Sequence, residues 1–322
     1  MAKDLKSIGI IVNPNSGKDI RRLVASASSV SSQHKSNELV KVYEGISKEG
    51  INKVYIMPDF SDISRKSREK YSNLIETEII KTSSLDEELT TIEAAKKMEK
   101  LDLSCIIVFG GDGTARLVSN YVKKTPILPI STGTNNLFPE NIDGTVAGMV
   151  AGKYSKIDNK NFFYERVKKL DVYFENKLVD SALVDIVSCK IPYVGARAIW
   201  EMDSISEVFV NKISPYGIGF SSIGFNLGQS LDKYHSMYID ISNDQKKCSK
   251  KIYAPIAPGK IEEILINNWK LFKKNEIINI RLKKGTLALD GERRIEFSDN
   301  NVNIRINHNG PKCLKIKEIL SN

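Results

Sequence analysis

The chain has 322 residues, 41% of them hydrophobic, and a net charge of +9, so it holds enough apolar material for one large domain or two ordinary ones. It contains no apolar run of about 18 residues, so we expect no stable membrane insertion. It contains no platform of basic and aromatic side chains, so we expect no nucleic-acid partner. We interpret the positive charge as attraction for anionic ligands. The four cysteines lie far apart, no cysteine–histidine cluster indicates zinc, and no signal-peptide core precedes the first strand, which together predict free thiols and a cytoplasmic protein.

The first half of the sequence alternates apolar runs of strand length with amphipathic segments. We expect strands at residues 7–12, 52–57, 103–109 and 126–130. We expect helices at residues 19–32, 62–74, 85–99, 114–122 and 144–153. The serine-rich stretch 26–36 is interpreted as a helix end and a loop. Such alternation predicts a parallel sheet flanked by helices.

The predicted helix at 85–99 has a defined beginning and a defined buried face. Ser84 and Glu87 match a capping box, in which each side chain bonds a backbone N–H at the helix start. The apolar face of this helix would consist of Leu85, Leu89, Ile92 and Ala95. The pattern therefore predicts that these side chains pack on the sheet.

From about residue 168 the pattern changes to short strands of alternating polarity, separated by turn residues. We expect strands at residues 170–174, 178–187, 236–241, 250–256, 276–282, 286–289, 294–297 and 302–306, which predicts a mostly antiparallel β domain. The expected fold is therefore an α/β nucleotide-binding domain at 1–160, with a parallel sheet flanked by helices, and a β-rich substrate or oligomerisation domain at 161–322. The C-terminal tail could return to the first domain.

Three of the predicted strands run into polar turns that contain glycine. The turns are Asn13-Pro14-Asn15-Ser16-Gly17-Lys18, Gly110-Gly111-Asp112-Gly113-Thr114 and Ser131-Thr132-Gly133-Thr134-Asn135-Asn136. Because the carboxyl ends of parallel strands meet at one edge of a sheet, we expect the turns to lie together where ligands bind. Glycine lets bare backbone N–H groups approach a phosphate, which predicts an anion site in the second turn. A carboxylate there would repel a phosphate, so we interpret Asp112 as a group that accepts a proton or holds a metal, the alternative being an N-cap of the next helix.

These turns resemble those of the superfamily of NAD kinases, diacylglycerol kinases and sphingosine kinases. Asp290-Gly291-Glu292 resembles an acidic motif near the end of the same enzymes. The finer resemblance is to the NAD-kinase-like branch that includes acetoin catabolism protein X, and it runs through nearly the whole chain. It implies an NAD-kinase-like two-domain fold, ATP and Mg²⁺ as cofactors, a homo-oligomer, and transfer of a phosphoryl group to a hydroxyl.

The resemblance also implies roles for individual residues. Asp112 would be the catalytic carboxylate, and Asp185 would bind the acceptor substrate. Asp290 and Glu292 would bind the metal, Glu292 indirectly. The nucleotide would be bound by Asn13, Ser16, Gly17, Lys18, Gly110, Gly111, Gly113, Thr114, Thr132, Gly133, Thr134, Asn135 and Asn136.

The residues by themselves leave alternatives open for several of these positions. Lys18 could be a solvated lysine and Asn135 a turn-former. Asp185 could be a satisfied strand carboxylate, and Asp290 to Glu292 could be only a tight turn.

The chain departs from authentic NAD kinases on the acceptor side. Val184 stands where those enzymes carry an asparagine that holds the ribose of NAD, although the acidic neighbour is matched by Asp185. The segment 219–224 departs from their loop as well. The sequence therefore supports the phosphate-donor half of the site better than the acceptor half.

Three hypotheses follow. The first is an ATP- and Mg²⁺-dependent kinase of a hydroxyl on a small molecule, with the 2′-hydroxyl of NAD as first candidate. The second is a lipid or polyol kinase of the diacylglycerol or sphingosine kinase type. The third is a regulatory protein that binds nucleotide without catalysis, since fold does not determine function.

Overall fold

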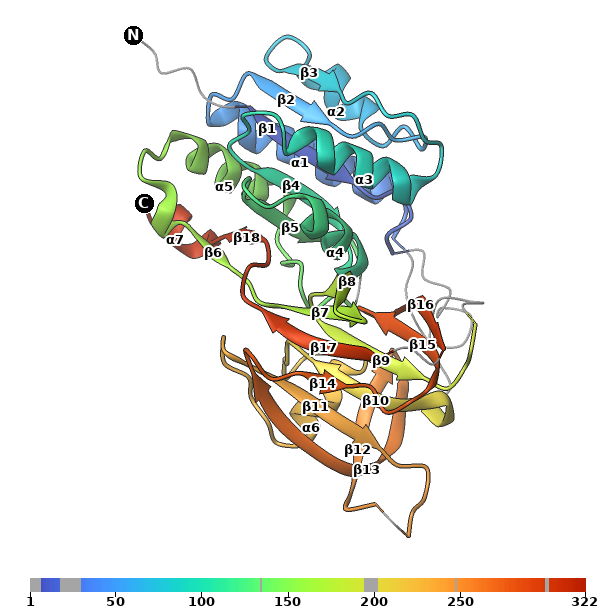
Figure 1. Ribbon diagram of the computed structural model, residues 1–322. Coiled ribbons are helices and arrows are strands. Elements are labelled where there is room, and N and C mark those ends of the chain that lie inside the picture. The colour runs from blue at the N-terminus through green and yellow to red at the C-terminus, as the bar shows by residue number, and fades with distance from the viewer. Residues whose placement is uncertain (1–6, 18–29, 134, 194–201, 247, 299–300) are drawn as a thin grey trace.

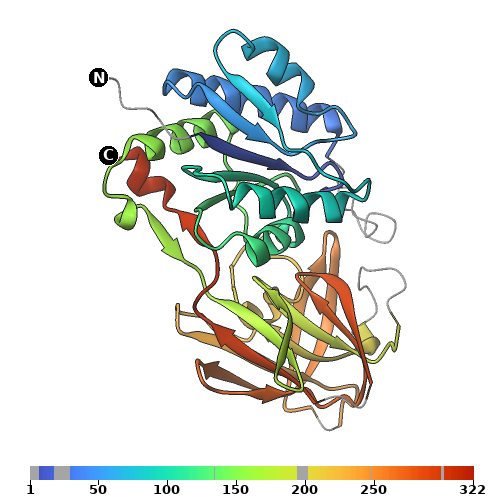
Figure 2. The same ribbon diagram turned by 45° about the horizontal axis from the view of Figure 1, so that its top comes forward.

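A computed structural model describes residues 7–17, 30–133, 135–193, 202–246, 248–298 and 301–322. The chain forms two units, an α/β unit drawn above a β-rich unit in Figure 1. The last helix of the chain, α7 (Ile316–Leu320), lies in the α/β unit, as both views show (Figures 1 and 2). The positions Lys18 and Thr134, and the predicted helix at 19–32 up to residue 29, fall outside the described residues.

The sheet of the α/β unit has the strand order β3-β2-β1-β4-β5-β18-β6, and its first five strands are parallel. Their bounds are β1 Ile8–Val12, β2 Lys53–Ile56, β3 Glu76–Ile79, β4 Ile106–Gly110, β5 Ile127–Ser131, β6 Tyr164–Arg166 and β18 Lys312–Leu314. The central strand β1 pairs Ile10 with Ile56 on one side and with Ile107 on the other. The order of strands therefore reverses between β1 and β4, and such a reversal opens a crevice for ligands at the carboxyl ends of the strands.

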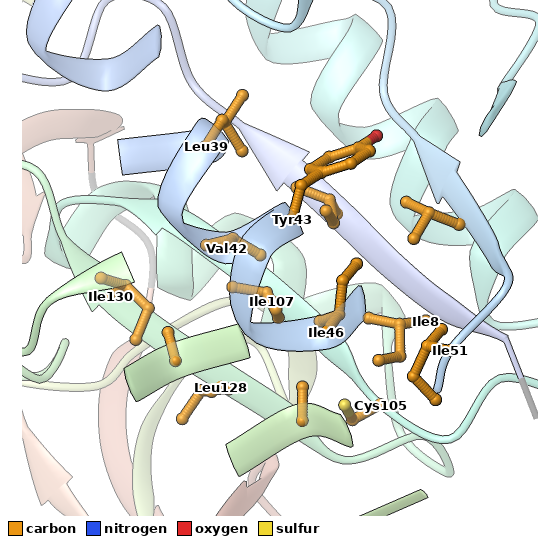
Figure 3. Close-up of a cluster of buried hydrophobic side chains, with 14 of the residues drawn as sticks. Ile8, Leu39, Val42, Tyr43, Ile46, Ile51, Cys105, Ile107, Leu128 and Ile130 are labelled. Atoms are coloured by element: carbon orange, nitrogen blue, oxygen red, sulfur yellow. The ribbon is translucent and has the colours of Figure 1, made fainter. Parts of the chain in front are cut away.

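Helices cover both faces of this sheet. Their bounds are α1 Ser32–Lys48, α2 Arg65–Tyr71, α3 Glu87–Met98, α4 Asp112–Tyr121 and α5 Gly144–Lys156. On one face, α1 contributes Leu39, Val42, Tyr43 and Ile46 to a buried cluster with Ile8, Ile107, Leu128 and Ile130 of the sheet (Figure 3). On the opposite face, Met98 of α3 and Val118 of α4 are buried with Ile106. Because both faces are covered, the strands are continuous apolar runs rather than alternating ones.

Glycines line the contact between α1 and α5. Gly144, Gly148 and Gly152 recur every fourth residue and so lie on one face of α5. A Cβ atom on Gly148 would stand 2.3 Å from the carbonyl oxygen of Val42, and one on Gly45 of α1 would stand 2.4 Å from that of Thr145. The two helices can therefore approach this closely only with glycine at these positions.

The β-rich unit stacks two antiparallel sheets. The larger has the order β12-β13-β11-β10-β9-β15-β16, and the smaller has the order β14-β17-β7-β8. Val172 and Ile304 of the smaller sheet are buried with Ile186 and Phe209 of the larger one, while α6 (Ser221–Asn226) covers the other face of the larger sheet. The strand bounds are β7 Lys169–Phe174, β8 Lys177–Ala182, β9 Asp185–Cys189, β10 Ile205–Val210, β11 His235–Ile241, β12 Lys250–Ala257, β13 Lys260–Lys273, β14 Ile278–Asn279, β15 Lys284–Leu289, β16 Glu292–Ser298 and β17 Val302–Asn307.

Two short connections form a neck between the units, one from β6 to β7 and one from β17 to β18. They lie side by side, because Arg166 pairs with Lys312 at one end and Lys169 pairs with Asn307 at the other. Within the neck, the N–H of Val167 donates to the carbonyl oxygen of Pro311 over 3.0 Å. The last strand and helix of the chain thus return to the α/β unit.

The expected fold class is confirmed: an α/β part with a parallel sheet flanked by helices precedes a part built from antiparallel sheets. Within the described residues, no helix is both long enough and apolar enough to cross a bilayer. Two long elements were not predicted, namely α1, which begins inside the stretch interpreted as a helix end and loop, and the strand β13. The strand expected at 178–187 is two strands, β8 and β9, which belong to different sheets.

The expected beginning of the helix near residue 85 is wrong, and its expected buried face is right at Ala95 but wrong at the two leucines. Its N-cap is Asp86, whose carboxylate accepts from the N–H of Leu89, so Ser84 and Glu87 do not form a capping box. Leu85 and Leu89 are 82% and 52% exposed. The buried face instead carries Thr90, Thr91, Ala94, Ala95 and Met98. The sequence pattern predicted the helical repeat correctly but assigned part of the buried face to the wrong residues, because two threonines rather than the two leucines are buried.

We expect Gly148→Ala to lower the free energy of unfolding by about 1–3 kcal/mol, since the added methyl group forces α1 and α5 apart. Alanine favours an isolated helix over glycine by about 1 kcal/mol, so a loss would identify the helix contact as the cause. Urea unfolding of both proteins measures the difference. Lys153→Ala on the same helix is the control, and a Gly148→Ala protein at least as stable as the parent would contradict the prediction.

Lys168 lies in the neck and should make stability rise at alkaline pH. Its ammonium donates to the carbonyl oxygens of Asp232 and His235. Burial lowers the pKa of Lys168 to about 8, against an opposing effect of the Asp232 charge. Between about pH 8 and pH 10.4, the usual lysine value, the unfolded chain binds more protons than the folded one, so stability increases with pH in this window. Lys168→Met should lose the part of this increase that Lys168 contributes and keep the part from Lys123, whose pKa burial also lowers to about 8. Lys233→Met, at an exposed lysine, should retain the whole increase. Urea unfolding across the window measures the difference.

Candidate functional site

The carboxyl ends of β1, β4 and β5 lie side by side, at the point where the strand order reverses. The three glycine-containing turns follow these strands, so they occupy the edge where parallel sheets bind ligands. The structure thereby brings together residues that the sequence separates by more than a hundred positions.

Hydrogen bonds join the first turn to the other two. Nδ2 of Asn13 donates to Oγ1 of Thr114 over 2.8 Å. Oγ of Ser16 and Oγ1 of Thr132 share a hydrogen bond of 2.5 Å. The N–H of Thr132 in turn donates to the carbonyl oxygen of Gly110 over 3.2 Å. The three turns are therefore one connected surface.

Four of the glycines at this surface are sterically or conformationally constrained. A Cβ on Gly110 would stand 2.4 Å from Cβ of Thr114, and one on Gly111 would stand 2.8 Å from Oδ1 of Asn136. A Cβ on Gly133 would stand 3.0 Å from Nδ2 of the same asparagine. Gly17 has a φ of +73°, which side-chain-bearing residues rarely adopt. These positions leave the backbone of the turns bare toward a ligand.

Asn136 and Asn135 complete the third turn. Nδ2 of Asn136 donates to Oγ of Ser131 over 2.8 Å, which fixes the asparagine against Gly111 and Gly133. Asn135 is partly buried beside it. Asn136 therefore shapes the turn from within.

Lys35 supports the first turn, although no sequence motif indicates it. This lysine of α1 is only 1% exposed. Its ammonium donates to the carbonyl oxygens of Asn13 and Pro14 over 3.1 and 2.6 Å. A buried cation is thus held directly behind the turn, where it adds positive potential to the edge of the sheet.

Asp112 is the first residue of α4, and its carboxylate reaches back to the third turn. It accepts from the N–H of Leu137 at 3.0 and 3.1 Å and from that of Phe138 at 2.7 Å. The N-cap of α4 is Gly111, with no side-chain cap, so the alternative of Asp112 as an N-cap is wrong. Two backbone donors fix the carboxylate at the junction of the second and third turns.

Asp290 lies in the β-rich unit and is enclosed by backbone amides. Its carboxylate accepts from the N–H groups of Leu183 (3.1 Å), Val184 (2.8 Å) and Asp185 (3.2 Å). The residue forms the turn between β15 and β16 with Gly291, and its own N–H donates to the carbonyl oxygen of Asp185 over 3.0 Å. Its oxygens are therefore committed to the segment between β8 and β9, and do not face an open metal position.

The charge state of Asp290 reflects competing effects. Burial raises its pKa well above the ordinary value, and the carboxylates of Asp185 and Asp112 raise it further. The guanidinium of Arg116 and the amide of Val184 act in the opposite direction. Asp112, Arg116, Asp185 and Asp290 therefore form one electrostatic group that spans both units.

Glu292 follows this turn and faces the start of α4. A Cβ on Gly113 would stand 3.9 Å from its carboxylate, and its side chain is 47% exposed. In the described part of the chain, no three His, Cys, Asp or Glu side chains cluster in a way that could hold a metal ion. Mg²⁺, however, commonly takes only one or two carboxylates and completes its shell with water and substrate phosphate. Glu292 fits that requirement at the phosphate turn; Asp290 does not.

Asp185 and its surroundings define the second half of the site. Asp185 begins β9 and is 5% exposed. Val184, at the position where NAD kinases carry asparagine, packs in an apolar cluster with Ala115, Phe138 and Leu183. Nδ2 of Asn211, which sequence reasoning missed, fixes this segment from the other side by donating to the carbonyl oxygen of Leu183 over 2.8 Å.

Comparisons with known proteins agree with this arrangement. Residues 8–154 match the family model of the ATP-NAD kinase N-terminal domain, and residues 168–309 match that of the acetoin catabolism protein X C-terminal domain. A curated relative, acetoin catabolism protein X of Cupriavidus necator, is 29% identical over 96% of this chain and 90% of its own length.

Among solved structures, a candidate diacylglycerol kinase from Bacillus anthracis strain Sterne is similar with a TM-score of 0.50 and 12% identity, over 98% of this chain and 99% of that one. At this identity the likeness concerns the fold alone. Residues 8–154 are therefore similar to the N-terminal domain of ATP-NAD kinases, and residues 168–309 are similar to the C-terminal domain of acetoin catabolism protein X.

Proposed function

We propose that the protein is an ATP- and Mg²⁺-dependent kinase that transfers a phosphoryl group to a hydroxyl of a small molecule. One observation carries the proposal: three glycine-containing turns are hydrogen-bonded together where the strand order reverses, with the Asp112 carboxylate fixed between two of them. Phosphoryl transfer needs a polyphosphate cradle, a counter-charge and a carboxylate for the acceptor, and this edge of the sheet offers each.

The donor half would work through the backbone and short side chains. Amide N–H groups of Gly110, Gly111, Gly113 and Thr114 would hold the phosphates, while Asn13, Ser16 and Gly17 line the nucleotide side with Thr132, Gly133, Asn135 and Asn136. Lys18 and Thr134 belong to the same proposal on the resemblance alone. Mg²⁺ would supply charge neutralisation, held at the phosphates through Glu292.

The acceptor half would centre on two carboxylates. Asp112 would accept the proton of the attacking hydroxyl, because it is the partly exposed carboxylate at the phosphate turn. Asp185 would orient the acceptor from the other unit. A binding site between two units allows water to be excluded when both substrates are bound.

NAD is the first candidate acceptor, and a lipid or polyol is the second. Val184 favours the second, because its position in the apolar cluster offers no amide for a ribose. Incubation with labelled ATP and a panel of NAD, NADH, diacylglycerol, sphingoid base and simple polyols separates the two. Nucleotide binding without transfer to any of them would instead favour the regulatory alternative. A cytoplasmic location remains a prediction from the cysteine usage, and a homo-oligomer remains a prediction of the resemblance.

We expect Asp112→Asn to lower the rate of transfer by about 10²–10⁴-fold, since an amide cannot accept the proton. The affinity for ATP should change little, because the amide oxygen can still accept from Leu137 or Phe138. Asp102→Asn is the control, since it makes the same change at an exposed aspartate near the opposite edge of the sheet. Steady-state rates and ATP titration measure both quantities, and transfer by Asp112→Asn at the parental rate would refute the assigned role.

Thr132→Val should weaken nucleotide binding without altering the shape of the side chain. The substitution removes the hydroxyl bonded to Ser16, and so loosens the first turn against the third. Loss of one such hydrogen bond corresponds to about 0.5–1.5 kcal/mol, or a rise in the KM for ATP of about 2–10-fold. Thr132→Ser keeps the hydroxyl and should restore the parental KM. Equal KM values in the two variants would show that this contact does not serve the nucleotide.

A further inference from the structure

Arg116 is a buried charge on the helix that begins with Asp112. It lies four residues after Asp112 on α4, so it is on the same side of the helix one turn further on. Its side chain is 1% exposed. Burying a guanidinium is unfavourable unless it is paired, so the partners of Arg116 must account for its burial.

Arg116 crosses from the α/β unit to the β-rich unit. Its Nη1 donates to Oδ2 of Asp180 on β8 over 2.7 Å. Nδ2 of Asn120, one turn further along α4, donates to Oδ1 of the same carboxylate over 2.8 Å. This face of α4 is therefore fastened to β8 at two points.

A second contact links Arg116 to the segment 183–185, which bears Asp185 and is called the acceptor segment below. Its Nε lies 3.9 Å from Oδ2 of Asp290, a distance for charge attraction rather than a direct hydrogen bond. The Asp290 carboxylate accepts from the amides of Leu183, Val184 and Asp185. A continuous path thus runs from Asp112 along α4 to Arg116, across to Asp290, and on to the backbone of Asp185.

We propose that Arg116 is a positioning residue that holds the segment bearing Asp185 at a fixed place relative to the turn bearing Asp112. The proposal rests on the proposed function in so far as these two carboxylates serve the same reaction. Arg116 itself touches no substrate: its side chain is enclosed, and each of its two charge contacts is an aspartate of the β-rich unit.

The first test is independent of any activity. Amide hydrogen exchange of the intact protein is followed in Arg116→Met, which keeps an unbranched, largely apolar stem but removes the charged guanidinium. Exchange at Leu183, Val184 and Asp185 should accelerate by about tenfold or more, while β1 and β4 stay protected. Arg281→Met is the matched control, since that arginine also pairs with two carboxylates, Glu207 and Asp240, but within the β-rich unit. Unchanged exchange at 183–185, or an equal increase in the control, would overturn the proposal.

The second test separates positioning from general destabilisation. With an acceptor identified, Arg116→Met should lower kcat by about 10–100-fold and raise the KM for the acceptor, with the KM for ATP within about twofold of the parent. Arg116→Lys keeps the charge and should recover part of kcat. Should Arg116→Met fail to fold, Asp180→Asn, which weakens the same link, takes its place in both tests. A loss confined to the KM for ATP would contradict positioning of the acceptor segment; absence of transfer by the parent would instead refute the proposed function, while the exchange experiment still decides on Arg116.

Discussion

The carboxylate of Asp112 connects two turns that would otherwise be independent loops. This carboxylate belongs to the first residue of α4 and accepts from the backbone N–H groups of Leu137 and Phe138, which follow the third turn. Around it, side-chain hydroxyls and Asn13 join the first turn to the same group. A loop edge held by so many short hydrogen bonds is ordered before a ligand arrives, which reduces the entropy lost on binding. The anion surface depends on this order, because backbone amides bind phosphate only when they point in a common direction.

The proposed acceptor side is organised by the same kind of interaction, a carboxylate that accepts from backbone amides, but this one lies in the β-rich unit. Asp290 of the β-rich unit gathers the amides between β8 and β9, as Asp112 gathers those beyond the third turn. Arg116 stands between the two carboxylates and belongs to the helix of the first. Charge and backbone geometry are therefore coupled across the boundary between the units. This coupling gives a reason for the buried charges of Arg116, Asp185 and Asp290 at this boundary, since buried charges rarely improve stability by themselves.

Sequence reasoning predicted where the three turns meet because its signals are local. Three strands followed by glycine-containing turns predict both the sheet and this meeting point. Gly17, Gly110, Gly111 and Gly133 proved to be sterically constrained, whereas Gly113 has room for a Cβ. Sequence reasoning did not predict the contributions of Lys35, Arg116 and Asn211. Each of them depends on a partner distant in sequence, and none lies in a recognisable motif. Asp290 was noticed as part of an acidic turn, but the motif does not indicate that its oxygens accept from the amides between β8 and β9, which only the structure shows. Helix α1 was missed because the serines before it are typical of a loop. Its packing on the sheet depends on residues distant in sequence, which local patterns do not indicate.

The neck between the units restricts how they can move. Its two connections are hydrogen-bonded to each other, and a Cβ on Gly310 would stand 2.1 Å from the carbonyl oxygen of Val167, so they cannot slide apart as independent tethers. Each connection is also flanked by strand pairing on both sides, Arg166 with Lys312 and Lys169 with Asn307. A change in the relative placement of the two units would therefore have to alter both backbones together.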